Sequence, residues 1–282
     1  MTGKKIKEKV KLILLNIGFI LLSFLTLIPI LYAFSISISG SNSIISTEFH
    51  ILPKTITMDN YITILTERPF GRWFVNSLLL SALTVLLTML VAVPAAYVFS
   101  RMRFVGRKRT LYILLVLNAF PAILSMFAIY RIIKTLNLLN SYMGLVFIYA
   151  GSMAIFVFWN MKGYFDTIPV EIEEAAMIDG CGPFRILTSI IIPMCKPGIV
   201  TVCMISAMAA WNEYPVALVM VTDPTKATLP VGLANLYEIQ RYATDWGALF
   251  AALVLALIPT VILFIVGQKQ LVQGLSVGGV KG

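Results

Sequence analysis

The sequence is poor in charge, cysteine and histidine. Of its 282 residues, 12% are charged and 59% are hydrophobic, which departs far from the composition of soluble domains. Cys181, Cys195 and Cys203 show no metal-ligand or redox spacing, and His50 is the only histidine. No G-x-x-x-x-G-K-[ST] segment occurs. These shortages argue against a soluble protein, a metal site built on these residues, and a phosphate-binding loop on this chain.

Long apolar runs take up most of the chain. Six of them meet or approach the ~20 residues needed to cross ~30 Å of hydrocarbon, so we predict an all-α integral membrane protein with six membrane-spanning helices. The first run follows a Lys-rich start, but it is longer than a signal-peptide core and lacks an A-x-A site, which favours an uncleaved span. No linker or repeat is evident, so we predict a single domain over residues 1–282. The predicted spans are Leu12–Ile38, Phe74–Phe99, Thr110–Ile133, Tyr142–Met161, Gly198–Val221 and Leu249–Val266.

Lysines and arginines are unevenly distributed among the loops. They concentrate in residues 1–11 and in the connection after the second span. The positive-inside rule therefore predicts a multi-pass protein with both termini in the cytoplasm. On this topology residues 39–73 form an outer loop, and residues 162–197 and 267–282 are cytoplasmic. The net charge of +9 then reflects contact with anionic lipid rather than with nucleic acid.

The longest predicted cytoplasmic loop contains a short helix. Thr167 is available as its cap, Pro169 suits its first turn, and Gly180 is a natural stop. Acidic residues follow the start, where the positive end of a helix favours carboxylates. About eleven residues give ~16 Å, too short to cross a bilayer, so the helix is expected to lie along the inner surface. A second short helix is expected to end before Pro193.

The side chains of this short helix suggest a docking surface. Ala175 and Ala176 leave one side without bulk, with Glu174 beside them and Asp179 further along. A small apolar knob with an acidic rim suits insertion into a cleft with basic or hydrogen-bonding walls. From composition alone, a solvated amphipathic surface helix is the alternative.

Charge is nearly absent inside the predicted spans. The exception is the segment Asn212-Glu213-Tyr214-Pro215 in the fifth span. A carboxyl at this depth is costly and is expected to face the protein interior or a wet cavity, and Pro215 is expected to kink the helix. Asn212, Glu213 and Tyr214 are therefore candidates to line a translocation path, or to form an internal polar lock without substrate contact. Ion-coupled carriers generally need more intramembrane ionisable groups, so a neutral substrate such as a sugar, driven by a separate ATPase, fits better.

Several motifs resemble one family at its spacing. Glu174-Ala175-Ala176 with Gly180, Ile190 and Ile192-Pro193 resembles an EAA loop, although Ile192 stands where Leu is commoner. Residues 96–107 fit the pattern A-Y-x-x-[AS]-R-x-x-F-x-G-[RK], and residues 267–282 resemble the family's ending. From about residue 50 to its end the chain resembles the MalG-like permease subunits of maltose and oligosaccharide ABC importers. That resemblance implies a type I ABC importer permease fold with a cytoplasmic EAA coupling helix.

The resemblance also assigns roles to particular residues. In the family the EAA helix docks in a cleft of a cytoplasmic ATPase, and the C-terminal tail reaches into the interface of the ATPase dimer. Composition alone predicts a flexible tail over Gly274–Gly282, because glycine disfavours a helix. In the maltose system the sugar site belongs to the other permease subunit, which weakens any sugar-binding role for the pore candidates. The implied ATPase-coupling residues are Glu173, Glu174, Ala175, Ala176, Asp179 and Gly180, and the implied tail residues are Gly274, Leu275, Gly278, Gly279 and Lys281.

The resemblance further implies an assembly in a bacterial cytoplasmic membrane. Its expected members are this chain, a second and non-identical permease subunit, a homodimeric ATPase subunit and an extracytoplasmic sugar-binding protein. This chain is expected to be no enzyme and to hold no cofactor or metal, because MgATP is bound by the ATPase. The expected substrate is a neutral, maltodextrin-like oligosaccharide, with raffinose-type or galacto-oligosaccharides as alternatives. A stand-alone secondary carrier would need coupling-ion residues beyond Glu213, and an intramembrane enzyme would need convergent catalytic or metal-binding groups in the spans.

Overall fold

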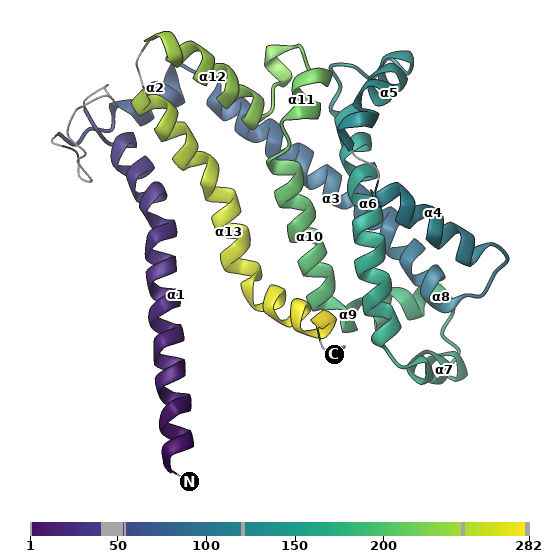
Figure 1. The fold of residues 1–282 in the computed structure, drawn as a ribbon. Helices are drawn as coiled ribbons and strands as arrows, with labels where there is room; N and C mark the ends of the chain where they lie inside the picture. Colours follow the sequence, from purple (N-terminus) through teal and green to yellow (C-terminus); the bar gives the residue numbers. More distant parts are fainter. Residues whose placement is uncertain (1, 41–52, 54, 120–121, 244–245, 280–282) are drawn as a thin grey trace. The chain divides into compact units, whose positions relative to one another are not determined.

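The computed structural model describes residues 2–40, 53, 55–119, 122–243 and 246–279. Helices dominate the described part of the chain, beside one isolated antiparallel bridge between Ser39 and Ile56 (Figure 1). The elements are α1 (Thr2–Ser37), α2 (Asp59–Thr66), α3 (Phe70–Arg101), α4 (Arg107–Ala119), α5 (Ala122–Thr135), α6 (Tyr142–Thr167), α7 (Val170–Ile178), α8 (Pro183–Ile186), a π-helical turn (Leu187–Ile191), α9 (Ile192–Met194), α10 (Lys196–Trp211), α11 (Pro215–Met220), a 3-10 turn (Pro224–Lys226), α12 (Leu229–Ala243) and α13 (Trp246–Gly279).

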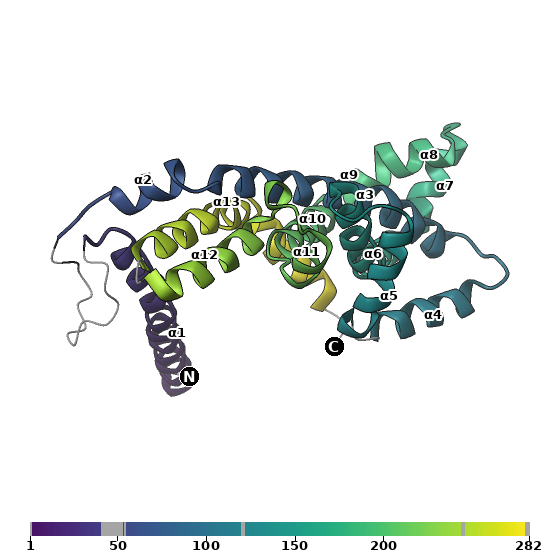
Figure 2. The ribbon, with the colours of Figure 1, turned by 90° about the horizontal axis from the view of Figure 1, so that it is seen from above.

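The backbone divides into two compact units. One comprises residues 1–70 and 233–257, and the other comprises residues 71–232 and 258–282. The helices of each unit can be followed from a second direction in Figure 2. The single domain predicted over residues 1–282 stays a prediction, and each unit is described by itself.

Four of the predicted spans are confirmed as continuous helices. By length and composition, four segments of the described residues can each cross a membrane. They correspond to the first, second, fourth and sixth predicted spans. The confirmed segments are Lys9–Ser37, Phe70–Arg101, Tyr142–Thr167 and Trp246–Leu271.

The other two predicted spans are interrupted. Arg107–Ala119 and Leu124–Thr135 together make one candidate span, bent by 104°. The predicted fifth span, Gly198–Val221, is wrong as one continuous helix, because α10 ends at Trp211 and α11 begins at Pro215. Proline lacks the N–H that a helix interior requires, which favours a new helix start there. In the structure α10 forms a bent candidate span with Pro183–Met194, at 82°.

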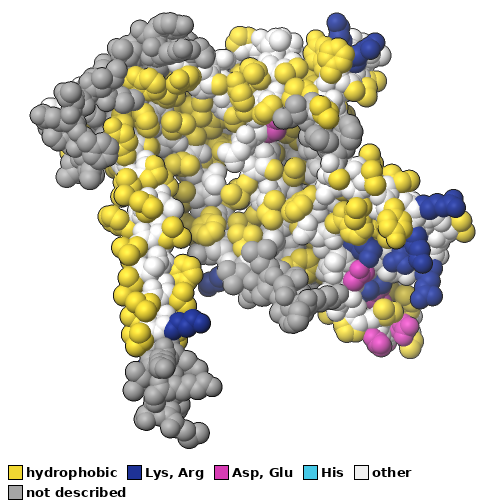
Figure 3. Space-filling model, in the orientation of Figure 1, with side chains coloured by type: hydrophobic (Ala, Val, Ile, Leu, Met, Phe, Trp, Pro, Cys, Tyr) yellow, Lys and Arg dark blue, Asp and Glu magenta, His cyan; other side chains and the backbone are white. Residues whose placement is uncertain are grey.

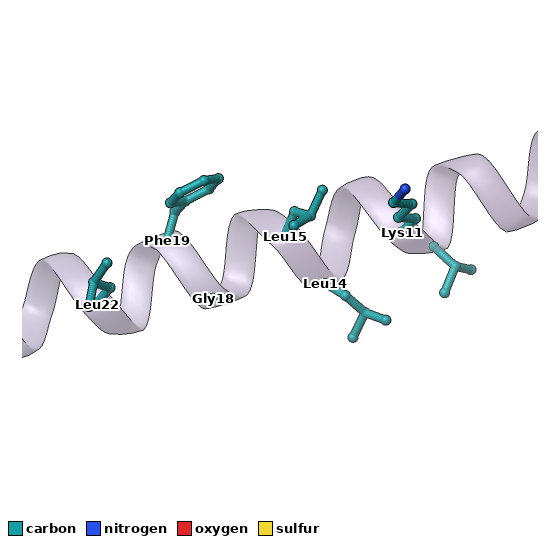
Figure 4. A pocket seen from close by; sticks show the side chains of 7 residues that line it. Lys11, Leu14, Leu15, Gly18, Phe19 and Leu22 are labelled. Atoms are coloured by element: carbon teal, nitrogen blue, oxygen red, sulfur yellow. The ribbon is translucent and has the colours of Figure 1, made fainter.

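In the first unit, α1 has no packed face over most of its described length. None of its residues from Lys9 to Phe34 is buried, and hydrophobic side chains cover much of its visible surface (Figure 3). Figure 4 shows the side chains near Gly18. These side chains line a shallow hollow, and all residues that line it belong to α1. At the other end of α1, the buried Asn60 amide donates to the carbonyls of Ser37 and Ser39, both at 3.0 Å. These bonds fix α2 against the end of α1.

Two clusters of buried apolar side chains lie among the described residues of the second unit. One joins the end of α3 and the second half of α6 to the 168–195 segment and the start of α10. The other joins the first half of α3 to the start of α6 and the α10–α11 junction. The first cluster includes Ala96, Tyr97, Phe165, Ala176, Ile186 and Ile191, and the second includes Leu80, Leu145, Tyr149, Ala210 and Met220.

Polar side chains fix the connection between α11 and α12. The Asn76 amide donates to the carbonyls of Thr225 and Ala227 at 3.2 and 2.9 Å. Tyr142 donates to the Asn76 oxygen at 2.8 Å. The Asn140 oxygen accepts from the backbone N–H of Thr222 at 2.7 Å. The loop is therefore held by α3, by the start of α6 and by the turn that precedes α6.

Candidate functional site

The short helix predicted in the 162–197 loop is confirmed as α7, Val170–Ile178. Pro169 immediately precedes it, and the chain leaves it through Gly180 at φ +80°, a left-handed conformation that glycine adopts without steric cost. Thr167 is not its cap, because the Thr167 hydroxyl donates to the Tyr164 carbonyl within α6. The prediction that the next helix ends before Pro193 is also wrong, since helical backbone continues through α9 to Met194.

The underside of α7 is fixed by a buried carboxylate. Glu173 is 2% exposed. One of its oxygens accepts a hydrogen bond from the Tyr97 hydroxyl at 2.8 Å, and the other meets Arg101 Nε at 2.5 Å. Arg101 Nη2 also donates to the Ile168 carbonyl at 3.0 Å, just before α7. A buried carboxylate requires this kind of pairing, so the last turn of α3 holds α7 in place.

A second polar contact joins α3 to α6 beside this pair. Ser100 donates to Asp166 at 2.6 Å, and Lys162 forms an ion pair with the same carboxylate at 2.6 Å. Lys162 and Asp166 lie four residues apart on α6, the spacing that brings helical side chains together. The ends of α3 and α6 and the start of α7 therefore form one connected polar group.

The predicted coupling residues divide between two faces of α7. Glu173 and Ala176 face inward, and Ala176 belongs to the buried cluster. The expectation that Ala175 and Ala176 together leave one side of the helix open is therefore wrong: the spacing of three between Glu173 and Ala176 puts both on the packed face. The predicted coupling residues that are exposed are Glu174, Ala175, Asp179 and Gly180.

Large apolar side chains that the sequence reasoning missed are exposed beside these residues. Met177 is 56% exposed, Ile178 87% and Phe184, in the adjoining α8, 79%. We call the set Glu174, Ala175, Met177, Ile178, Asp179 and Phe184 the α7 surface. Apolar residues directly before a helix-ending Asp-Gly pair were the available signal. Carboxylates beside exposed apolar side chains are suited to a protein contact that combines burial with charge pairing.

The break between α10 and α11 is built around Glu213. One Glu213 oxygen accepts from the Tyr149 hydroxyl at 2.8 Å and from the Ala217 N–H at 3.1 Å. The other accepts from the Val216 N–H at 2.9 Å. Glu213 thus satisfies N–H groups in the first turn of α11, which favours the internal polar lock. A pore-lining role stays a prediction for Asn212, Glu213 and Tyr214. The exposed Asn212 donates to the Met208 carbonyl of its own helix.

The predicted tail continues from a packed helix. The backbone of α13 is helical to Gly279, so the flexible tail expected from composition is wrong for Gly274–Gly279. Lys281 lies outside the described residues. Upstream in α13, the Gln270 carbonyl accepts a hydrogen bond from the Thr201 hydroxyl of α10 at 3.4 Å. Since Gly267 has no side chain, α13 approaches Met204 of α10 closely.

Comparisons with known proteins find relatives that are all membrane components or permeases of transport systems. Residues 85–277 match the family described as binding-protein-dependent transport system inner membrane component. The chain is 32% identical over 278 residues to the trehalose/maltose transport system permease protein MalG of Thermococcus litoralis, covering 98% of this chain and 99% of that protein. It is 33% identical over 288 residues to the galactooligosaccharides transport system permease protein GanQ of Bacillus subtilis, covering 100% of both.

A solved structure has the same fold. It is that of a bacterial ABC transporter involved in the import of the acidic polysaccharide alginate, with a TM-score of 0.79 and 27% identity. The similarity covers 95% of this chain and 98% of that chain. The membrane-permease fold predicted from the EAA loop, the 96–107 segment and the C-terminal segment is thereby confirmed.

Proposed function

This chain belongs to the family of binding-protein-dependent transport system inner membrane components, and we propose that within it α7 couples a sugar pathway to a separate ATPase. The chain is a permease of the sugar ABC importer type. As such it supplies a path through the membrane, and ATP hydrolysis takes place on a partner. The proposed assembly contains a second, non-identical permease, a homodimeric ATPase that binds MgATP, and an extracytoplasmic sugar-binding protein.

The two-sided construction of α7 carries this proposal. Its inner face is fixed by Glu173 to Arg101, the last residue of a membrane-spanning helix. Its outer face, the α7 surface, is exposed. A partner that grips the exposed face and moves therefore pulls on the end of α3 through a buried ion pair rather than through a flexible loop. The carboxylates of Glu174 and Asp179 suit a cleft with basic or hydrogen-bonding walls.

The proposed substrate is a neutral oligosaccharide. Glu213 is committed to Tyr149 and α11. An acidic substrate would favour cationic groups along the path, and none of the described Lys and Arg residues lies in the middle of the four continuous candidate spans. Relatives named for trehalose/maltose and for galactooligosaccharides support a sugar of this class. We propose a maltodextrin-like sugar, with a galacto- or raffinose-type oligosaccharide as the alternative.

The proposed location is a bacterial cytoplasmic membrane, with both termini and α7 on the cytoplasmic side. The clustering of Lys and Arg in residues 1–11 and 101–109 supports this orientation. The exposed apolar surface of α1 supports contact with lipid or with the second permease.

Purification of the tagged chain from its native membrane in mild detergent tests the assembly. We expect a second permease and an ATPase to co-purify, and MgATP hydrolysis to rise with one sugar plus its binding protein. Uptake by liposomes that contain this chain alone, without ATP, would overturn the proposal and indicate a secondary carrier.

A charge reversal on the α7 surface tests the coupling step. Glu174→Lys is expected to abolish sugar-stimulated hydrolysis and uptake while leaving membrane insertion normal. Glu67→Lys is the matched control, because Glu67 is also an exposed carboxylate and lies next to α2 rather than α7. Equal activity of the two variants would contradict a role for the α7 surface.

A further inference from the structure

We propose that the turn between α3 and α4 is a binding site for an anionic phospholipid, with the headgroup phosphate at Arg103, Lys108 and Arg109. The lipid's acyl chains lie along α4. Residues 103–109 alone line a hollow of about 790 Å³, which is within the size range of small-ligand sites. The inference concerns a ligand other than the transported sugar and does not depend on the coupling role of α7.

The turn has a defined shape. The Phe104 ring packs edge-on against Phe99, with ring centres 5.0 Å apart. Arg107 Nε donates to the Phe99 carbonyl at 2.9 Å, and Gly106 reverses the chain at φ +89°. Two aromatic rings, a guanidinium and a left-handed glycine therefore hold the turn against the end of α3. The exposed basic side chains extend from this fixed backbone.

Three of the five cations at the turn have no protein partner among the described residues. Arg101 is paired with Glu173, and Arg107 bonds to backbone carbonyls. The remaining basic residues are exposed, and no hydrogen bond or ion pair joins their side chains to the rest of the described chain. They are Arg103, Lys108 and Arg109.

The two acids that contact the end of α3 are already occupied. Asp166 is shared by Ser100 and Lys162, and Glu173 by Tyr97 and Arg101. Figure 3 shows Lys and Arg side chains gathered on the outer side of this region, with Asp and Glu side chains beside and below them. The three cations consequently present uncompensated positive charge that an external anion can neutralise.

The helix that follows indicates that the anion belongs to a lipid. No residue of α4 is buried. Leu111 and Leu114 pack partly against the first buried cluster, whereas the apolar side chains on the remaining faces are 54–71% exposed. These exposed side chains are Tyr112, Ile113, Leu115, Val116 and Leu117.

The distribution of exposure around α4 favours lipid over a protein partner. A docked protein would cover one face of the helix, while acyl chains can surround all faces that are not packed. Val105, at the tip of the turn, is fully exposed, and an apolar tip flanked by cations matches the boundary between headgroups and acyl chains. Basic residues at the end of a span bind anionic headgroups by the same electrostatics.

The test measures lipid retained by the intact transporter. The complex is reconstituted in nanodiscs made of phosphatidylcholine with about one quarter phosphatidylglycerol. It is then released from the nanodiscs under mild conditions, and its bound lipid is identified by native mass spectrometry. We expect Lys108→Gln/Arg109→Gln to weaken phosphatidylglycerol retention on the order of tenfold. Adding Arg103→Gln is expected to weaken it further. Arg109→Lys, which keeps the charge, is expected to retain the lipid.

The matched control is Arg131→Gln/Lys134→Gln on α5, which removes one exposed Arg and one exposed Lys elsewhere. Equal lipid loss in the two double variants would overturn the proposal in favour of general surface charge. Displacement of phosphatidylglycerol by inorganic phosphate, but not by sodium chloride at equal ionic strength, would indicate a site for free phosphate. Loss of the ATPase from the purified complex with unchanged lipid retention would indicate that a protein covers the turn.

Discussion

The carboxylate of Glu173 lies 2.5 Å from Arg101 Nε, and only 3% of the Glu173 side chain and 11% of the Arg101 side chain are exposed. The two residues are far apart in sequence, yet they join the end of a span to the short helix α7. Burial makes this contact different from a surface ion pair. Removing one partner leaves a charge in a poorly solvated place, whereas removing both leaves an apolar junction.

Arg101→Met is expected to destabilise the protein by about 3–5 kcal/mol, because Glu173 loses its cation and keeps only Tyr97 as a partner. The double variant Arg101→Met/Glu173→Met is expected to recover most of that loss. Thermal unfolding of the purified protein in detergent, followed by size-exclusion chromatography, measures both. A single variant as stable as the native protein would show that the pair contributes little.

Glu213→Ala is expected to destabilise the junction of α10 and α11, because it leaves the Tyr149 hydroxyl and the N–H groups of Val216 and Ala217 without their acceptor. Each unsatisfied buried group costs about 1–3 kcal/mol. Glu213→Gln keeps one acceptor oxygen and is expected to lose less. The exposed Asn212 supplies the control Asn212→Ala. Unfolding temperatures give the comparison.

Transport kinetics separate the polar lock from the pore-lining alternative for Glu213. If Glu213 is a lock, the folded fraction of Glu213→Gln transports sugar with an unchanged KM. A raised KM in a variant of native stability would instead place Glu213 in contact with the substrate.

Gly144→Ala tests how closely the turn before α6 covers the first turn of that helix. A methyl group at Gly144 would collide with the backbone carbonyl of Leu138, and a backbone atom cannot move aside as a flexible side chain can. The expected loss is about 1–3 kcal/mol. Gly151→Ala on the same helix has no neighbour within 4 Å of the new methyl group, and it is expected to be neutral or mildly stabilising. Equal unfolding temperatures would contradict the packing.

The continuous spans could be predicted from the sequence because span length and apolarity are local properties. The segment Tyr142–Thr167, for example, has enough apolar residues in an uninterrupted helix. The break after Trp211 was harder to predict. Pro215 alone is compatible with a kink in one continuous helix. The interruption also depends on Glu213, whose carboxylate accepts hydrogen bonds from the N–H groups of α11 and from the Tyr149 hydroxyl of another helix. Tyr149 is 64 residues away from Glu213 in the sequence.

The existence of the short helix α7 was predictable from its Pro and Gly boundaries, but its orientation was not. The sequence drew attention to Glu174, whereas the buried carboxylate is its neighbour Glu173. Which of two adjacent glutamates faces inward depends on where Arg101 and Tyr97 are placed by a different helix. The motif at residues 96–107 and the EAA loop were recognised separately, and their contact required the fold.

The family resemblance implies that the C-terminal tail docks in the ATPase dimer, and we propose that it does so as a helical extension of a packed span, because α13 remains helical to Gly279. Deleting Ser276–Gly282 is expected to reduce sugar-stimulated ATP hydrolysis by the assembled transporter while leaving its assembly intact. Ser276→Pro keeps the full length but breaks the helix, and it is expected to have a similar effect. Ser276→Ala, which favours a helix, is the matched control.

The three tail variants separate contact from helix continuity. If Ser276→Pro couples normally and the deletion does not, the tail contacts the ATPase without needing a continuous helix. If the deleted transporter couples hydrolysis to sugar as the native one does, the tail does not transmit movement between ATPase and membrane. Coupling would then pass through α7 and its buried link to Arg101, the other described connection between a candidate docking surface and a span.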